Sequence, residues 1–91
     1  MTSHTASDFA PSDPAYDRGF ALMRTAATLA YHAATTKSAA PGPARLYAEA
    51  IGDYRVALEE FRRSPHPHAP QRIAFVEKEI ARLEPLARDT Q

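Results

Sequence analysis

The sequence predicts an all-α protein, an antiparallel up-down-up bundle of three helices that follows a flexible N-terminal tail. Three segments carry apolar residues at steps of three and four, the spacing that places side chains on one face of an α-helix. Two proline-rich breaks separate these segments. The 91 residues suffice for one domain. We expect residues 1–12, which lack periodicity, to form the tail and residues 13–91 the bundle.

The first helix is expected at 14–36. Asp13 is a suitable N-cap, and a proline at position 14 fits the first helical position, where its missing N–H costs nothing. This helix has two adjacent apolar stripes, the first through Tyr16, Phe20, Met23, Ala27, Ala30 and Ala34, the second through Leu22, Ala26, Leu29 and Ala33. The opposite face is polar and should be solvated: Arg18, Thr25, Thr28, His32 and Thr35.

The second helix is expected at 43–63, after a linker that ends in Pro41-Gly42-Pro43. Its apolar stripe consists of Tyr47, Ile51, Tyr54, Leu58 and Phe61. Pairs of opposite charge four residues apart support this helix: Arg45–Glu49, Arg55–Glu59 and Glu59–Arg63. Gly52 is unfavourable within a helix, so we expect it to allow close packing against a neighbouring helix.

The third helix is expected at 70–84, after a loop that holds three prolines between Ser64 and Pro70. Pro85 should end or kink this helix near Leu83, because its ring displaces the carbonyl of Ala81. The predicted core joins the three stripes: Phe20, Met23, Ala27, Ala30, Tyr47, Ile51, Tyr54, Leu58, Phe61, Ile73, Val76, Ile80 and Leu83.

Composition argues against several classes of protein. Eleven basic residues balance eleven acidic ones, so the basic face of a nucleic-acid binder is missing. There is no cysteine, and no apolar run approaches the ~20 residues of a membrane span. No secretory signal is visible, so we expect a cytoplasmic protein. The preference for arginine over lysine, with much alanine and proline, suggests a GC-rich bacterial genome.

Residues that could carry chemistry are sparse. His66 and His68 are two apart in an extended segment and should point to opposite sides, so we interpret them as loop histidines without a role. The acidic pairs Glu59-Glu60 and Glu77/Glu79 lie among arginines and should be exposed. No phosphate loop, nucleophile elbow or triad is present. We therefore expect no enzyme, no metal and no cofactor.

Two stretches resemble the microtubule-interacting and trafficking (MIT) domain, whose second helix typically reads Ala-x-x-x-Tyr-x-x-Ala-Ile. Here residues 46–51 keep the Leu-Tyr-x-x-Ala-Ile part, and 81–86 keep the arginine, glutamate and leucine of the family's Asp-Arg-Ala-Glu-then-Leu ending. The resemblance implies a three-helix bundle that holds a short peptide, usually an amphipathic helix, in a groove between two helices. The family's acidic ligand contacts map to Ala81 and Glu84, and the first of these has lost its acid.

The function we expect is therefore that of a non-catalytic module that binds a peptide or partner helix in an interhelical groove. One alternative is a structural subunit that self-associates through the alanine-rich face of the first helix, and another is a small enzyme or metal-binding bundle. The third helix has two flanks, one with Phe75, Glu79, Arg82 and Leu86, the other with Glu77, Ala81, Glu84 and Arg88. We predict that Phe75, Arg82 and Glu84 bind the partner, with apolar anchors inside a charged rim.

Overall fold

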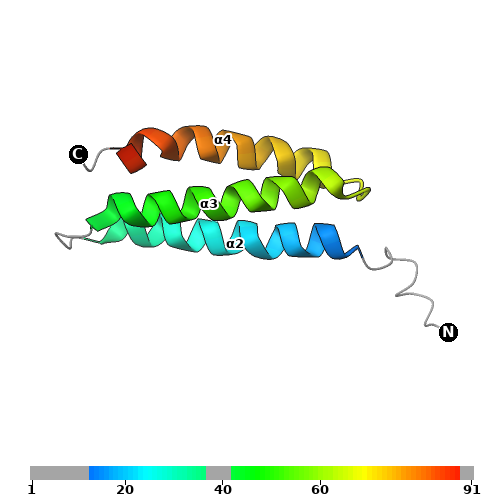
Figure 1. Ribbon diagram of the computed structural model, residues 1–91, viewed down its shortest axis with the longest axis horizontal. Coiled ribbons are helices and arrows are strands. Elements are labelled where there is room, and N and C mark those ends of the chain that lie inside the picture. The colour runs from blue at the N-terminus through cyan, green and yellow to red at the C-terminus, as the bar shows by residue number, and fades with distance from the viewer. Residues whose placement is uncertain (1–12, 37–41, 89–91) are drawn as a thin grey trace.

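The computed structural model describes residues 13–36 and 42–88, and these form three α-helices and no strand. They are α2 (Pro14–Thr35), α3 (Gly42–Arg63) and α4 (Ala69–Arg88). Consecutive helices run in opposite directions, so the all-α up-down-up bundle is confirmed (Figure 1). The expected tail at 1–12 and most of the first linker lie outside the described residues.

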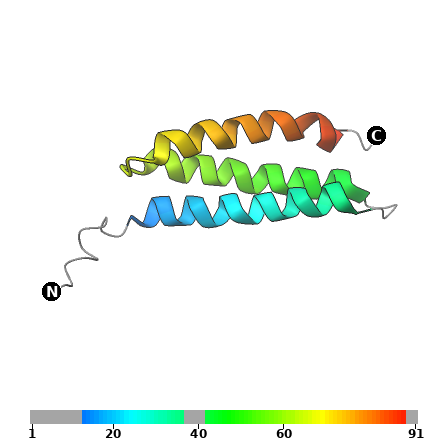
Figure 2. The same cartoon turned by 180° about the vertical axis from the view of Figure 1, so that it is seen from behind.

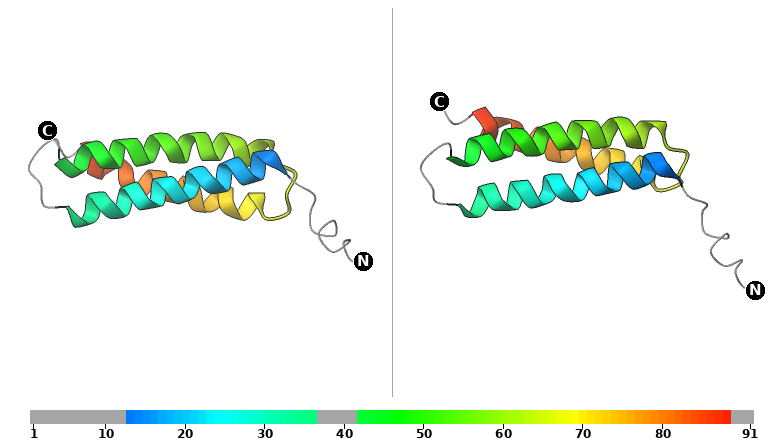
Figure 3. Two further views of the ribbon diagram at one scale, coloured as in Figure 1. Left: turned by 90° about the horizontal axis from the view of Figure 1, so that it is seen from below. Right: turned by 60° about the horizontal axis from the view of Figure 1, so that its bottom comes forward.

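The central helix is α3, which packs along both of its neighbours, while α2 and α4 meet over a short stretch only (Figures 1 and 2). Figure 3 shows that α4 is inclined to the other two helices. The first turns of α2 and α4 are joined by Arg72, whose Nε donates a hydrogen bond to the Tyr16 hydroxyl over 3.0 Å. The molecule is therefore two helix pairs that share α3.

The start of α2 follows local sequence rules. Asp13 is the N-cap that we expected, and its Oδ1 accepts a hydrogen bond from the Tyr16 backbone N–H at 3.1 Å. Proline occupies the first helical position. The helix ends at Thr35, one residue before the expected boundary, and Thr36 is extended. The polar side predicted for this helix is exposed throughout.

All predicted core residues but one are buried or partly buried. Seven predicted residues are buried: Met23, Ala30, Ile51, Tyr54, Phe61, Val76 and Leu83. Five more are partly buried and pack against them: Phe20, Tyr47, Leu58, Ile73 and Ile80. Ala27 is exposed, so its assignment to the core is wrong. The buried face of α2 runs between the two apolar stripes, through Gly19, Met23, Ala26, Ala30 and Ala33, because that line faces α3.

The two helical glycines have opposite environments, and the expectation for Gly52 is wrong. Gly52 is exposed, and a Cβ added there would meet no atom within 4 Å. The close approach occurs at Gly19 of α2 instead. A Cβ there would lie 2.9 Å from a ring carbon of Phe61 on α3. Gly19 therefore lets the two helices approach around a fully buried aromatic ring.

The third helix continues through Pro85 to Arg88, so the predicted end at 84 is wrong. Leu86 and Ala87 pack against the core beyond the proline, and their burial favours one further turn. Both Pro85 and Ala81 are exposed, so water can bond the carbonyl that the proline leaves without its helical donor. Tertiary packing thus outweighs the local signal to stop.

A candidate binding groove between the second and third helices

A groove of about 660 Å³ lies between α3 and α4. Its apolar surface comes from Val56, Leu58 and Ile80, and its charged rim from Arg55, Glu59, Arg62, Arg63 and Glu77. Val56 is 48% exposed, so much of its side chain is available to a ligand. Leu58 and Ile80 are half-buried, so part of each remains available to a ligand.

Ion pairs cross from α3 to α4 along this groove. The guanidinium of Arg62 lies 3.1 Å from Glu77, and that of Arg55 lies 2.7 Å from Glu84. The side chains are largely solvent-exposed, so each pair adds little to the free energy of folding. Their effect is on the shape and charge of the groove, because they set fixed charges of both signs beside its apolar surface.

The groove follows from how α3 divides its side chains. Tyr54, Leu58 and Phe61 point toward the core. Val56 lies between Tyr54 and Leu58, two residues from each, so its side chain points to the opposite side of the helix and outward. Gly52 lies one helical turn before Val56 on the same face and leaves open space there. Together they give α3 an outer face with one apolar contact and little side-chain bulk.

The structure does not bring the three predicted partner-binding residues together. Phe75 is 45% exposed, and Arg82 lies two turns further along the same flank, where it pairs with Glu79 at 2.6 Å. Glu84 lies on the other flank, where it bonds Arg55 of α3. Two residues along a helix correspond to a rotation of about 200°, so Arg82 and Glu84 face in different directions. None of the three lines the groove, although Glu84 holds one of its rim arginines.

The flank of Phe75 carries a second ionic arrangement, over the buried ring of Tyr54. The hydrogen bond from Arg82 to Glu79 raises the pKa of the Arg82 guanidinium. Burial raises the pKa of the Tyr54 hydroxyl, and the negative charge of Glu79 adds to the effect. Because Glu79 and Arg82 already pair with each other, this flank offers Phe75 as its main contact surface for a ligand.

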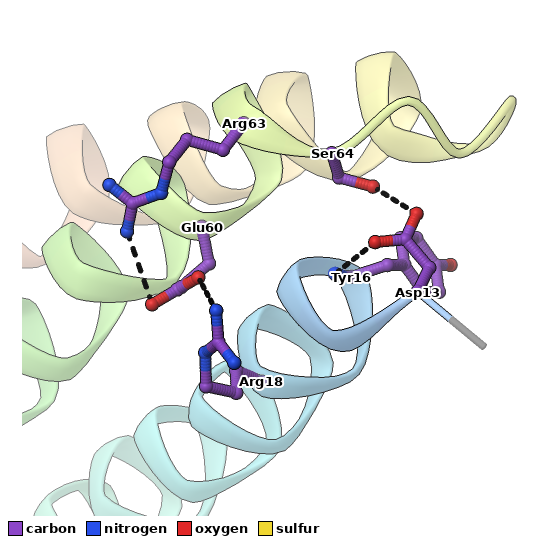
Figure 4. A network of polar contacts seen from close by, with 6 residues as sticks. All are labelled: Asp13, Tyr16, Arg18, Glu60, Arg63 and Ser64. Carbon is purple, nitrogen blue, oxygen red and sulfur yellow. Dashed lines mark hydrogen bonds and ion pairs between the residues drawn. The ribbon is translucent and has the colours of Figure 1, made fainter.

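A polar cluster ties the start of α2 to the end of α3 (Figure 4). Glu60 accepts from Arg18 at 3.1 Å and lies 3.2 Å from Arg63. The hydrogen bond from Arg18 lowers the pKa of Glu60, outweighing burial, which alone would raise it. Glu79 is partly buried and Glu60 is only 8% exposed, so the expectation that all four acidic residues of the two dense pairs are exposed is wrong for these two. No stripe or spacing marked Glu60, because its partner Arg18 is 42 residues away.

Asp13 holds the other end of the same cluster. Its Oδ2 accepts from the Ser64 hydroxyl at 2.8 Å, and Figure 4 shows the carboxylate between Ser64 and the first turn of α2. Desolvation alone would raise the pKa of Asp13, but the hydrogen bonds from Ser64 and the Tyr16 N–H lower it overall. The cluster is internally satisfied, so it fixes helix ends and offers no reactive group.

His66 has a structural contact that the sequence did not reveal. Its ring stacks on Tyr16 with centroids 3.8 Å apart, and its Nδ1 accepts from the backbone N–H of His68. The interpretation of both loop histidines as residues without a role is therefore wrong for His66. Within 13–36 and 42–88, no three His, Asp or Glu residues are grouped as a metal site requires.

Comparisons with known proteins leave the family open. No family model, no curated protein and no solved structure matches the chain. None of the described helices is both long enough and apolar enough to cross a membrane. The resemblance to the MIT domain therefore stays a prediction.

Proposed function

We propose that this protein is a non-catalytic interaction module that holds a short amphipathic helix in the groove between α3 and α4. The observation that carries the proposal is the combination of Val56, Leu58 and Ile80 with a rim of both charges. Helix-in-groove recognition uses an apolar stripe on the ligand and polar contacts at its edges. The same mode of binding is what the resemblance to the MIT domain implies.

The rim limits which helices fit. Arg62 is shared between Glu77 at 3.1 Å and Glu59 at 3.7 Å, and Arg55 is held by Glu84. A ligand of one charge would have to break such pairs, whereas a helix with both acidic and basic residues beside its apolar stripe can extend them. We therefore propose a ligand of mixed charge with two or three aliphatic anchors. Its affinity should be modest, because the apolar surface is small.

The test begins with a selection of displayed helical peptides that bind the whole protein. Binding of the selected peptides is then measured for two variants, Val56→Asp in the groove and Phe75→Asp on the opposite flank of α4. Both side chains are almost half exposed, so both variants should fold, and thermal melts check this. We expect Val56→Asp to abolish binding of the selected peptides and Phe75→Asp to leave it unchanged. The reverse result would place the partner on the flank of Phe75 and Arg82, two of the three residues predicted from the sequence.

Self-association is the second candidate function. Part of the surface expected for it, the alanine-rich face of α2, is already covered by α3. Ala26, Ala30 and Ala33 are buried on the side of α2 that packs on α3, so they are not available to a second copy. What remains on the outside of α2 is Tyr31, 70% exposed, with small residues around it. Light scattering over a concentration series distinguishes the two candidates, because a peptide-binding module stays monomeric at all concentrations.

A further inference from the structure

The arginines of this protein divide into paired and unpaired side chains. Six of the nine form ion pairs: Arg18, Arg45, Arg55, Arg62, Arg63 and Arg82. Arg24, Arg72 and Arg88 form none with any acidic residue of the described chain. Two of these three, Arg24 of α2 and Arg72 of α4, line one cleft of about 300 Å³ where the two helices meet.

Arg72 is held in position without its charge being neutralised. Its Nε donates to the Tyr16 hydroxyl at 3.0 Å, and its guanidinium lies 5.2 Å from the centroid of the Phe20 ring. Tyr16 is fixed in turn by stacking on His66 and by an edge contact with Phe61 at 5.5 Å. No hydrogen bond to a described residue uses the two terminal nitrogens of Arg72. A guanidinium fixed in this way is preorganised to bind an oxyanion through two parallel hydrogen bonds.

The other residues that line the cleft indicate which charge and which apolar group a ligand should carry. Phe20 and Ala21 give the cleft an apolar wall, and the Tyr16 hydroxyl accepts from Arg72 with its own hydrogen left to donate. Asp17 also lines the cleft and has no ion-pair partner among the described residues. Two guanidiniums and one carboxylate leave a net positive charge that attracts any anion, so it is the apolar wall that favours an anion with an apolar body over inorganic phosphate, which has none.

We propose that this cleft is a binding site for a carboxylate carried on an apolar body. The carboxylate bridges Arg24 and Arg72, and the apolar body lies against Phe20 and Ala21. The site is separate from the α3–α4 groove and shares no lining residue with it. The carboxylate can belong to a free organic acid or to the C-terminus of a peptide, and both present the same chemistry to the two arginines.

The test is an NMR titration of the whole protein with phenylacetate, acetate and inorganic phosphate at millimolar concentrations, observing the Tyr16 and Phe20 rings. We expect saturable shifts with phenylacetate and weaker ones with acetate and with phosphate, because neither small anion has an apolar body to lie against Phe20 and Ala21. Arg24→Gln should weaken phenylacetate binding about tenfold, the usual effect of losing one charge-assisted hydrogen bond. Arg24 is exposed, and its side chain forms no hydrogen bond or ion pair with a described residue, so this variant should fold normally.

Arg88→Gln is the matched control, because it removes an unpaired arginine outside the cleft. Phenylacetate should bind this variant as it binds the unaltered protein, whereas Asp17→Asn should strengthen phosphate binding. Equal losses in Arg24→Gln and Arg88→Gln, no saturable shift, or tighter binding of phosphate than of phenylacetate would each overturn the proposal. Competition with a peptide that ends in phenylalanine, either free or amidated at its C-terminus, then shows whether the natural carboxylate belongs to a peptide or to a free acid. If only the free form outcompetes phenylacetate, the carboxylate is a peptide's; if neither does, it is a free acid's.

Discussion

The two interfaces of α3 differ in how completely they close. Against α2, small residues such as Gly19 and Ala26 allow close approach, and Phe61 becomes fully buried. Against α4, larger aliphatic side chains such as Leu58 and Ile80 meet and stay half-exposed, so a groove of about 660 Å³ remains. The same helix thus forms one interface that buries the ring of Phe61 completely and another that leaves apolar side chains partly exposed.

The ion pairs show the same contrast. Glu60, at the α2–α3 interface, is buried and held by Arg18 and Arg63. The pairs between α3 and α4, such as Arg55–Glu84, are open to solvent on both partners. Charges in the closed interface support the fold, while those at the open interface remain accessible for exchange with a ligand.

Truncating a side chain at the closed interface should cost far more stability than truncating one in the groove. Phe61→Ala should lower the free energy of unfolding by about 3–5 kcal/mol, because a fully buried ring leaves a cavity. Val56→Ala should change it by no more than about 0.5 kcal/mol, since the side chain is half-exposed. Urea unfolding of both variants measures the difference. Similar losses for the two would show that the groove is part of the core.

The two helical glycines should respond to alanine with opposite signs. Gly19→Ala should destabilise the protein by about 1–3 kcal/mol, because the added methyl group presses on the Phe61 ring. Gly52→Ala should stabilise it by about 1 kcal/mol, because it improves helix propensity and meets no neighbour. Thermal melts of the single variants provide the comparison. A stabilising Gly19→Ala would mean that α2 and α3 can separate without cost.

Removing the His66 ring should have a moderate effect. His66→Ala should cost about 0.5–1.5 kcal/mol, the usual contribution of an aromatic stack, because Tyr16 loses the ring that lies against it. His68→Ala is the control, since that side chain is exposed and its ring contacts His66 and not Tyr16. Chemical denaturation at pH 7 compares the two. If the two variants were equally stable, the stacking on Tyr16 would contribute nothing.

The smallest effect concerns the pH dependence of the closed interface. Because folding lowers the pKa of Glu60, chiefly through the hydrogen bond from Arg18, its stabilising effect is complete above the carboxyl's ordinary pKa. That effect is lost as the pH falls through the lowered value. Glu60→Gln should therefore flatten the acid limb of a stability–pH profile, and Glu59→Gln, at an exposed neighbouring position, should not. Parallel profiles for Glu60→Gln and the unaltered protein would contradict this assignment.

Much of the fold depends on local rules, and those parts could be predicted from the sequence. The cap at Asp13, the proline-rich loop before α4 and the three apolar stripes involve residues within a few positions of one another. The Arg45–Glu49 pair formed as its spacing predicts. Helical spacing fixes the direction of each side chain around the helix axis to within about the 100° that one residue turns. This suffices to predict three helices and the large buried side chains, although Ala44, Ala50 and Ala57 of α3 are also buried and lie outside the predicted stripe.

The interfaces themselves were decided by the tertiary structure. The rotation of α2 buried Ala26 and exposed Ala27, although both lie on apolar stripes. Arg55 bonds Glu84 of α4 where the sequence offered Glu59 one turn away. Helical spacing alone puts Glu84 and Phe75 on different flanks of α4, but the packing of α4 on α3 decided that the groove lies on the flank of Glu84. Such pairings depend on how one helix is turned and inclined against another, and helical periodicity describes each helix only about its own axis.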